Sequence, residues 1–176
     1  MSASAPSAVT TTIVRRGTVS IEVLAQGAGH RIVLLPSLGR GASDFDVMAE
    51  RIADAGYRVL RPQPRGIGGS RSAESYADLH DCAADIAAAI ESDGGGAALV
   101  AGHAFGNRVA RMLATDRPDL VRGVSLIAAN VGHAPSTPPI REAIRNSANP
   151  ALPDQERLKA LRFAFFAPGN DPRPWL

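Results

Sequence analysis

Residues 98–106, Ala-Leu-Val-Ala-Gly-His-Ala-Phe-Gly, decide the fold of this chain. The apolar first half of this stretch is typical of a buried strand, and a helix over 105–115 is expected to follow at once. Gly102 and Gly106 lack a Cβ, so the backbones of the strand and the helix can approach closely. Ala104 is therefore predicted to lie at the tip of a sharp strand-to-helix turn. The alternative interpretation is an ordinary strand–helix connection through small residues.

Strands and helices alternate on both sides of this turn. Strands are expected over 11–16, 18–26, 31–35, 57–60, 97–101 and 121–128, and helices over 43–55, 75–93, 105–115, 140–147 and 154–166. The first two strands are joined at Gly17 and are interpreted as antiparallel, and the second shows the alternation of a strand exposed on one face. The later order implies a mostly parallel sheet that helices cover on both faces, with right-handed crossovers.

Two of the helices have sequence signals at their starts. Ser43 is a favourable cap, with Asp44 and Asp46 in the first turn, where the helix dipole favours acidic residues. Ser75 and Asp78 resemble a capping box at the start of the long second helix.

Composition excludes several classes of protein. The chain has 176 residues, of which 45% are hydrophobic and 20% charged, as expected for one soluble globular domain with a substantial core. The formal net charge is +2, Lys159 is the only lysine and the arginines are scattered. Such dispersion argues against nucleic-acid binding. No apolar run approaches the roughly 20 residues that a membrane helix needs, so no membrane partner is expected.

The single cysteine, Cys82, falls among alanines on a predicted helix and is expected to be packed. One thiol cannot form a disulfide within the chain, which favours a reducing, cytoplasmic compartment. Residues 1–10 lack the basic and apolar regions of a signal peptide and are expected to be a disordered tail.

Motifs for cofactors and metals are not found in the sequence. The four histidines and Cys82 have no spacing typical of metal ligands. Neither a phosphate-binding loop nor a dinucleotide G-x-G-x-x-G is present. We therefore expect no cofactor and no metal, and interpret His133 as a loop residue.

Three loops in order carry a resemblance to a known family. Leu-Leu-Pro-Ser-Leu-Gly at 34–39 is similar to a strand-to-loop segment usually written L-L-H-G-x-x. Arg-Pro-Gln-Pro-Arg-Gly-Ile-Gly-Gly-Ser at 61–70 is similar to P-D-x-R-G-x-G-x-S, with Gln63 in place of the acid. The turn at 102–106 is similar to G-x-S-x-G, with Ala104 in place of the serine. Over 11–129 the chain thus resembles the α/β-hydrolase family.

The resemblance implies a fold, an activity and site residues. The fold would be an α/β-hydrolase-like core over 11–130, followed by the start of a helical cap over 131–176 and truncated before the last strands. The activity would be hydrolysis of a small ester or acyl compound in an apolar pocket. The backbone N–H groups of Leu38 and Phe105 would form the oxyanion hole.

Ala104 contradicts that activity, because a methyl group cannot attack a substrate. After the turn, His133, Asp154 and Asp171 follow no predicted strand, so none is assigned the role of catalytic acid or base. Ser37 would face the same pocket but has no visible base partner. Serine-type catalysis is therefore not expected of the chain as written.

Three functional hypotheses remain open. The chain is a hydrolase scaffold whose serine was replaced, a non-catalytic domain that binds a small ligand or a protein, or a truncated product without independent function. In the third case, an open apolar sheet edge near 124–128 would promote self-association.

Overall fold

The computed structural model describes residues 8–73, 75–76, 78–94, 96–129 and 137–176. Six strands form one sheet in the order β1-β2-β4-β3-β5-β6. The strands are β1 (Thr10–Arg16), β2 (Val19–Gln26), β3 (Arg31–Leu35), β4 (Arg58–Pro62), β5 (Ala98–His103) and β6 (Val121–Ile127). The helices are α1 (Asp46–Asp54), α2 (Leu79–Ser92), α3 (Phe105–Asp116), α4 (Pro138–Ser147) and α5 (Asp154–Phe165), with 3-10 turns at Ala42–Phe45, Pro118–Leu120 and Arg173–Trp175.

Strand pairing confirms the predicted mostly parallel sheet. β1 and β2 form an antiparallel hairpin that turns at Gly17, whose φ is +58°. β2 also pairs antiparallel with β4, whereas β3 pairs parallel with both β4 and β5, and β5 pairs parallel with β6. The carboxyl ends of four strands therefore meet at one edge of the sheet, where ligands bind in open α/β folds.

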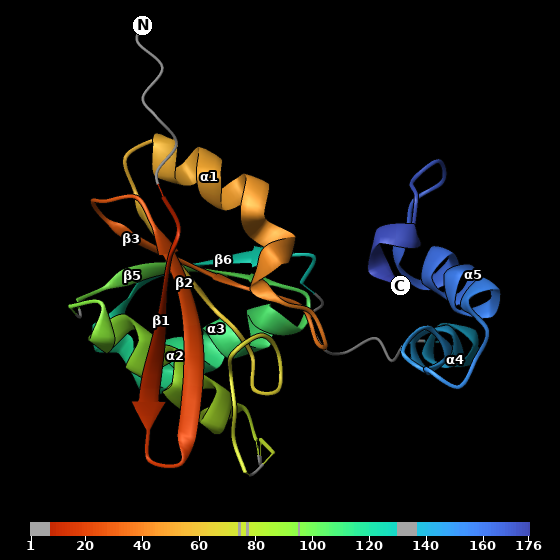
Figure 1. Cartoon of the computed structure of the whole chain (residues 1–176), viewed down its shortest axis with the longest axis horizontal. Helices are drawn as coiled ribbons and strands as arrows, with labels where there is room; N and C mark the ends of the chain where they lie inside the picture. The colour runs from red at the N-terminus through yellow and green to blue at the C-terminus, as the bar shows by residue number, and fades with distance from the viewer. Residues whose placement is uncertain (1–7, 74, 77, 95, 130–136) are drawn as a thin grey trace, which may run out of the picture. The chain divides into compact units, whose positions relative to one another are not determined.

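Helices cover both faces of the sheet (Figure 1), with α1 on one face and α2 and α3 on the other. Alternation along the strands explains this, because successive side chains point to opposite faces. On β3, Val33 and Leu35 belong to the core cluster that includes residues of α2 and α3, whereas Leu34 packs with Phe45 and Ala49 beside α1. An apolar run without polar interruption is what a strand covered on both faces requires.

Both predicted serine caps are wrong. Ser43 lies inside the 3-10 turn that precedes α1, and no side chain caps either element. α2 begins at Leu79, and the carboxylate of Asp78, not Ser75, accepts the N–H groups of His80 and Asp81 at 2.8 and 3.1 Å. An aspartate accepts hydrogen bonds from two free amides and its charge complements the helix dipole. This explains why Asp78, rather than Ser75, caps α2.

The chain divides into two compact units, Met1–Ala129 and Asn130–Leu176. The first holds the sheet with α1 to α3, and the second holds α4 and α5, which pack against each other. In the second unit, the ring of Trp175 contacts Phe165 and Phe166 at centroid distances of 5.9 and 5.1 Å. Of the expected N-terminal tail, residues 1–7 lie outside the described residues, and Thr10 already pairs with Ala25.

Candidate functional site

The turn between β5 and α3 has a strained tip. β5 ends at His103, α3 begins at Phe105, and Ala104 between them has φ +48° and ψ −106°. Its amide donates to the carbonyl oxygen of Ile127, at the end of β6, at 2.9 Å. Residues held at such angles cost about 1–3 kcal/mol and occur preferentially at functional sites. The surrounding structure, rather than the intrinsic backbone preference of alanine, therefore holds Ala104 at these angles.

Close backbone contacts explain the two glycines beside the tip. A Cβ added at Gly102 would overlap the Gly106 carbonyl and the amide of Asn107. A Cβ added at Gly106 would lie 2.7 Å from the Pro36 carbonyl oxygen and closer still to that of Leu35. The helix thus starts in direct contact with the strand before it and with the loop after β3.

A second strained residue lies nearby. Ala128, which directly follows β6, has φ +51°, and among the described residues Ala104 and Ala128 are the non-glycine residues with positive φ. The hydrogen bond from Ala104 to Ile127 links the two segments. Strain is thus concentrated where the carboxyl ends of β5 and β6 meet.

Replacing Ala104 with glycine tests this strain. We expect Ala104→Gly to raise the free energy of unfolding by about 1 kcal/mol, because relief of the positive φ outweighs the entropy lost by glycine. Urea denaturation followed by circular dichroism measures the change. Ala114→Gly, within α3, should instead lower stability by about 1 kcal/mol. Equal losses in both variants would show that the tip is relaxed.

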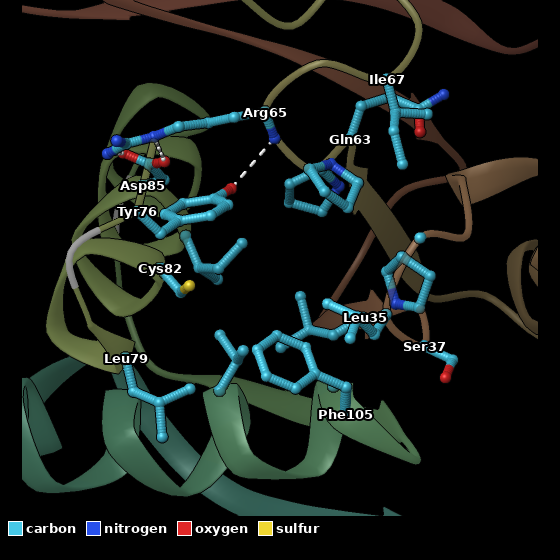
Figure 2. A pocket seen from close by; sticks show the side chains of 18 of the residues that line it. Leu35, Ser37, Gln63, Arg65, Ile67, Tyr76, Leu79, Cys82, Asp85 and Phe105 are labelled. Carbon is cyan, nitrogen blue, oxygen red and sulfur yellow. Dashed lines mark hydrogen bonds and ion pairs between the residues drawn. The ribbon is translucent and has the colours of Figure 1, made fainter. Parts of the chain in front are cut away.

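A pocket of about 650 Å³ opens beside the turn, within the first unit (Figure 2). This volume lies within the usual range for small-molecule sites, roughly 300–1,000 Å³. Its walls come from the loop after β3, the loop after β4, the start of α2 and the start of α3. The lining residues are Leu35, Pro36, Ser37, Leu38, Gly39, Pro62, Gln63, Pro64, Arg65, Ile67, Tyr76, Asp78, Leu79, Cys82, Asp85, Ile86, Phe105, Gly106 and Val109.

The structure brings some of the predicted site residues to this wall. Leu38, Phe105 and Gly106 line the pocket, whereas Ala104 and Gly102 do not. Figure 2 shows the ring of Phe105 directed into the cavity and Ser37 at its side. Predicted His133 lies outside the described residues.

A buried ion pair forms part of the polar wall. Asp85, 1% exposed on α2, accepts hydrogen bonds from Arg65 at 2.7 Å and from Arg16 at 2.8 Å. The hydrogen bond to Asp85 is the largest influence on Arg65 and raises the pKa of its guanidinium. A buried charge is tolerated only when paired, and here two arginines share one carboxylate, Arg65 from the pocket lining and Arg16 from β1.

The loop after β4 is anchored by the polar residues of its motif. The hydroxyl of Ser70 donates to the carbonyl of Gln63 at 2.8 Å and accepts the amide of Glu22 at 2.9 Å. The Gln63 side chain accepts the amide of Ala42 at 2.8 Å. Gln63 therefore joins this loop to the segment before α1, a role that needs an acceptor oxygen but no charge.

Other nucleophilic side chains of the pocket are unsuited to attack. Burial raises the pKa of the Cys82 thiol to about 11, so the thiolate is scarce at neutral pH. The Ser37 hydroxyl has no hydrogen bond to a base among the described residues. In that part of the chain, no group of three His, Cys, Asp or Glu residues could hold a metal ion, and no helix is long and apolar enough to cross a membrane.

Sequence reasoning expected Tyr76 on the buried face of the predicted helix over 75–93, quoted Arg65 only as part of a motif, and did not single out Asp85. Asp85 carried a usable signal, because it falls on the helix face that Cys82 and Ile86 bury. An acidic residue on a buried face needs a cationic partner. The helical position expected for Tyr76 is wrong, because α2 begins only at Leu79, and its contact with the loop after β4 could not be predicted from a helical pattern.

Comparison with known proteins agrees with the fold. A model described as the alpha/beta hydrolase family matches residues 32–176, and the chain therefore belongs to the α/β-hydrolase family. Epoxide hydrolase A of Mycobacterium tuberculosis is 36% identical over 96 residues, 51% of this chain and 30% of that protein. The 2-(acetamidomethylene)succinate hydrolase of Mesorhizobium japonicum is 29% identical over 111 residues, 63% of this chain and 40% of that protein.

Solved structures give the same result. An epoxide hydrolase from an endophytic Streptomyces superposes with a TM-score of 0.64 at 25% identity, covering 78% of this chain and 42% of that one. This chain thus spans less than half the length of these relatives.

Proposed function

We propose that this chain binds a small, largely apolar ligand in the pocket beside the β5–α3 turn and does not attack it covalently from position 104. The observation that carries the proposal is Ala104, which places a methyl group at a strained tip where hydrolases of this family place a nucleophile. Loss of the serine in a serine protease costs about 10⁶ in kcat. The pocket lies beside this tip and is lined by Phe105 and Gly106.

The lining supports an apolar ligand. Most of its side chains are hydrocarbon, and its buried charges, Asp85 and Arg65, are paired with each other. In this proposal the backbone amides of Leu38 and Phe105 occupy the oxyanion-hole position, and both residues line the pocket. The relatives named as hydrolases act on small molecules, which supports a small ligand here as well. In this proposal, residues 131–176 form the start of a cap.

Calorimetric titration with 2-acetylnaphthalene tests the binding. We expect saturable binding to the chain, and at least a tenfold loss of affinity in Ile67→Trp, because an indole at that half-buried position fills the pocket. The matched control is Ile13→Trp on β1, an exposed residue outside the pocket, which should leave the affinity unchanged. Binding that Ile67→Trp does not weaken would contradict the proposed site.

Turnover is measured separately on 4-nitrophenyl butyrate and styrene oxide. The chain should hydrolyse both at the buffer rate and resist labelling by a fluorophosphonate. A burst of nitrophenol, or covalent labelling that peptide mapping places on Ser37, would show that a nucleophile other than residue 104 acts here.

A further inference from the structure

Tyr76 presents its phenol to the pocket from the segment that precedes α2. Figure 2 shows the ring on the side of the cavity opposite Ser37, with the hydroxyl directed toward the loop after β4. There the hydroxyl oxygen accepts the backbone N–H of Arg65 at 3.0 Å. One lone pair of the phenol is therefore used within the protein.

The proton of this hydroxyl has no acceptor among the described residues. A phenol is both a donor and an acceptor, so the donor side of Tyr76 is left for a molecule in the cavity. Burial raises the pKa of the Tyr76 phenol to about 12, so the group keeps its proton at physiological pH. A half-buried donor without a partner gains free energy when a ligand supplies one.

The ring is held in place before any ligand binds. The guanidinium of Arg65 lies over the Tyr76 ring at 4.4 Å from its centroid, within the range of a cation–π contact. Asp85 in turn fixes that guanidinium through hydrogen bonds at 2.7 and 3.1 Å. Because the donor is already oriented, a ligand would not bear the entropic cost of ordering it.

We propose that Tyr76 donates a hydrogen bond to a neutral acceptor oxygen of the ligand, such as a ketone, ester or ether oxygen, and so selects oxygen-bearing apolar molecules over hydrocarbons. This inference rests on the proposed ligand-binding function. It names the ligand class, because the buried charges of Arg65 and Asp85 are already engaged with each other, whereas the phenol offers one neutral donor.

A matched pair of probes tests the donor. The ketone 2-acetylnaphthalene and the alkene 2-isopropenylnaphthalene differ mainly in C=O against C=CH₂. We expect Tyr76→Phe to lower the affinity for the ketone about fivefold, because a neutral hydrogen bond of about 1 kcal/mol is lost. The affinity for the alkene should stay unchanged. Tyr57→Phe removes the other tyrosine of the chain, which lies outside the pocket, and should change neither affinity.

Infrared spectroscopy of the bound ketone measures its carbonyl stretching frequency, which reports a hydrogen bond to the oxygen rather than packing of the ring. Its carbonyl stretch should lie lower in the wild-type pocket than in a hydrocarbon solvent, and should rise in Tyr76→Phe. Equal weakening of both probes, or a carbonyl stretch in the wild-type pocket equal to that in hydrocarbon, overturns the role of Tyr76 alone. If neither probe binds the wild-type chain, the proposed ligand-binding function fails, and this inference fails with it.

Discussion

Gly106→Ala is expected to lower the free energy of unfolding by about 3 kcal/mol, the upper part of the usual range for overpacking. The new methyl group would lie 2.7 Å from the Pro36 carbonyl oxygen and closer to that of Leu35. Both obstacles are backbone atoms, so no side-chain rotation can relieve the clash. To make room, α3 must move away from the loop after β3. Urea denaturation measures the loss.

Gly123→Ala is the matched control for this variant. Gly123 lies in β6, and a Cβ there would meet only the Leu99 side chain, at 4.0 Å. The control should therefore change stability by less than about 1 kcal/mol. If Gly106→Ala were as stable as Gly123→Ala, the close approach of α3 to the β3 loop would be wrong, and the position assigned to Ala104 would have to be reconsidered.

Asp85→Asn should cost about 3–5 kcal/mol, the usual loss when one partner of a buried ion pair is removed. The amide would keep one acceptor oxygen but direct its NH₂ at the guanidinium of Arg65 or Arg16. Arg65, whose side chain is 7% exposed, would then carry a buried charge without a counterion. We also expect weaker binding of both naphthalene probes, since Arg65 holds the ring of Tyr76.

Asp119→Asn breaks an ion pair of another kind and serves as the control. Its carboxylate accepts from Arg117 at 2.8 Å at the protein surface, where solvent screens the interaction. Little change in the unfolding curve is expected. Comparable losses in the two variants would mean that burial of Asp85 does not set the energy of its pair.

The sequence predicted the sheet and the turn because both depend on local patterns. Apolar runs such as 31–35 and 121–127 are strands in the structure, and the spacing of Gly102 and Gly106 alone indicates the close backbone approach that the structure shows. The start of α2 was predicted wrongly, because Ser75 and Asp78 have similar capping propensity and the surrounding fold selects Asp78.

The pocket itself could not be predicted from local patterns. Its walls come from four segments that are distant in the chain, and the direction of each side chain depends on how the loops pack. The motif at 61–70 identified the loop, but not that Gln63 would bind the amide of Ala42 or that Arg65 would lie over Tyr76. Oxyanion-hole roles for Leu38 and Phe105 stay predictions.

The conformation at position 104 is imposed by two flanking glycines and by one hydrogen bond to Ile127, and none of these involves the side chain at the tip. The turn should therefore keep its backbone conformation whichever side chain occupies position 104. A serine, cysteine or aspartate side chain at this position would point in the same direction as the methyl group of Ala104. A reactive side chain could therefore be introduced at position 104 by a single substitution, without redesign of the turn.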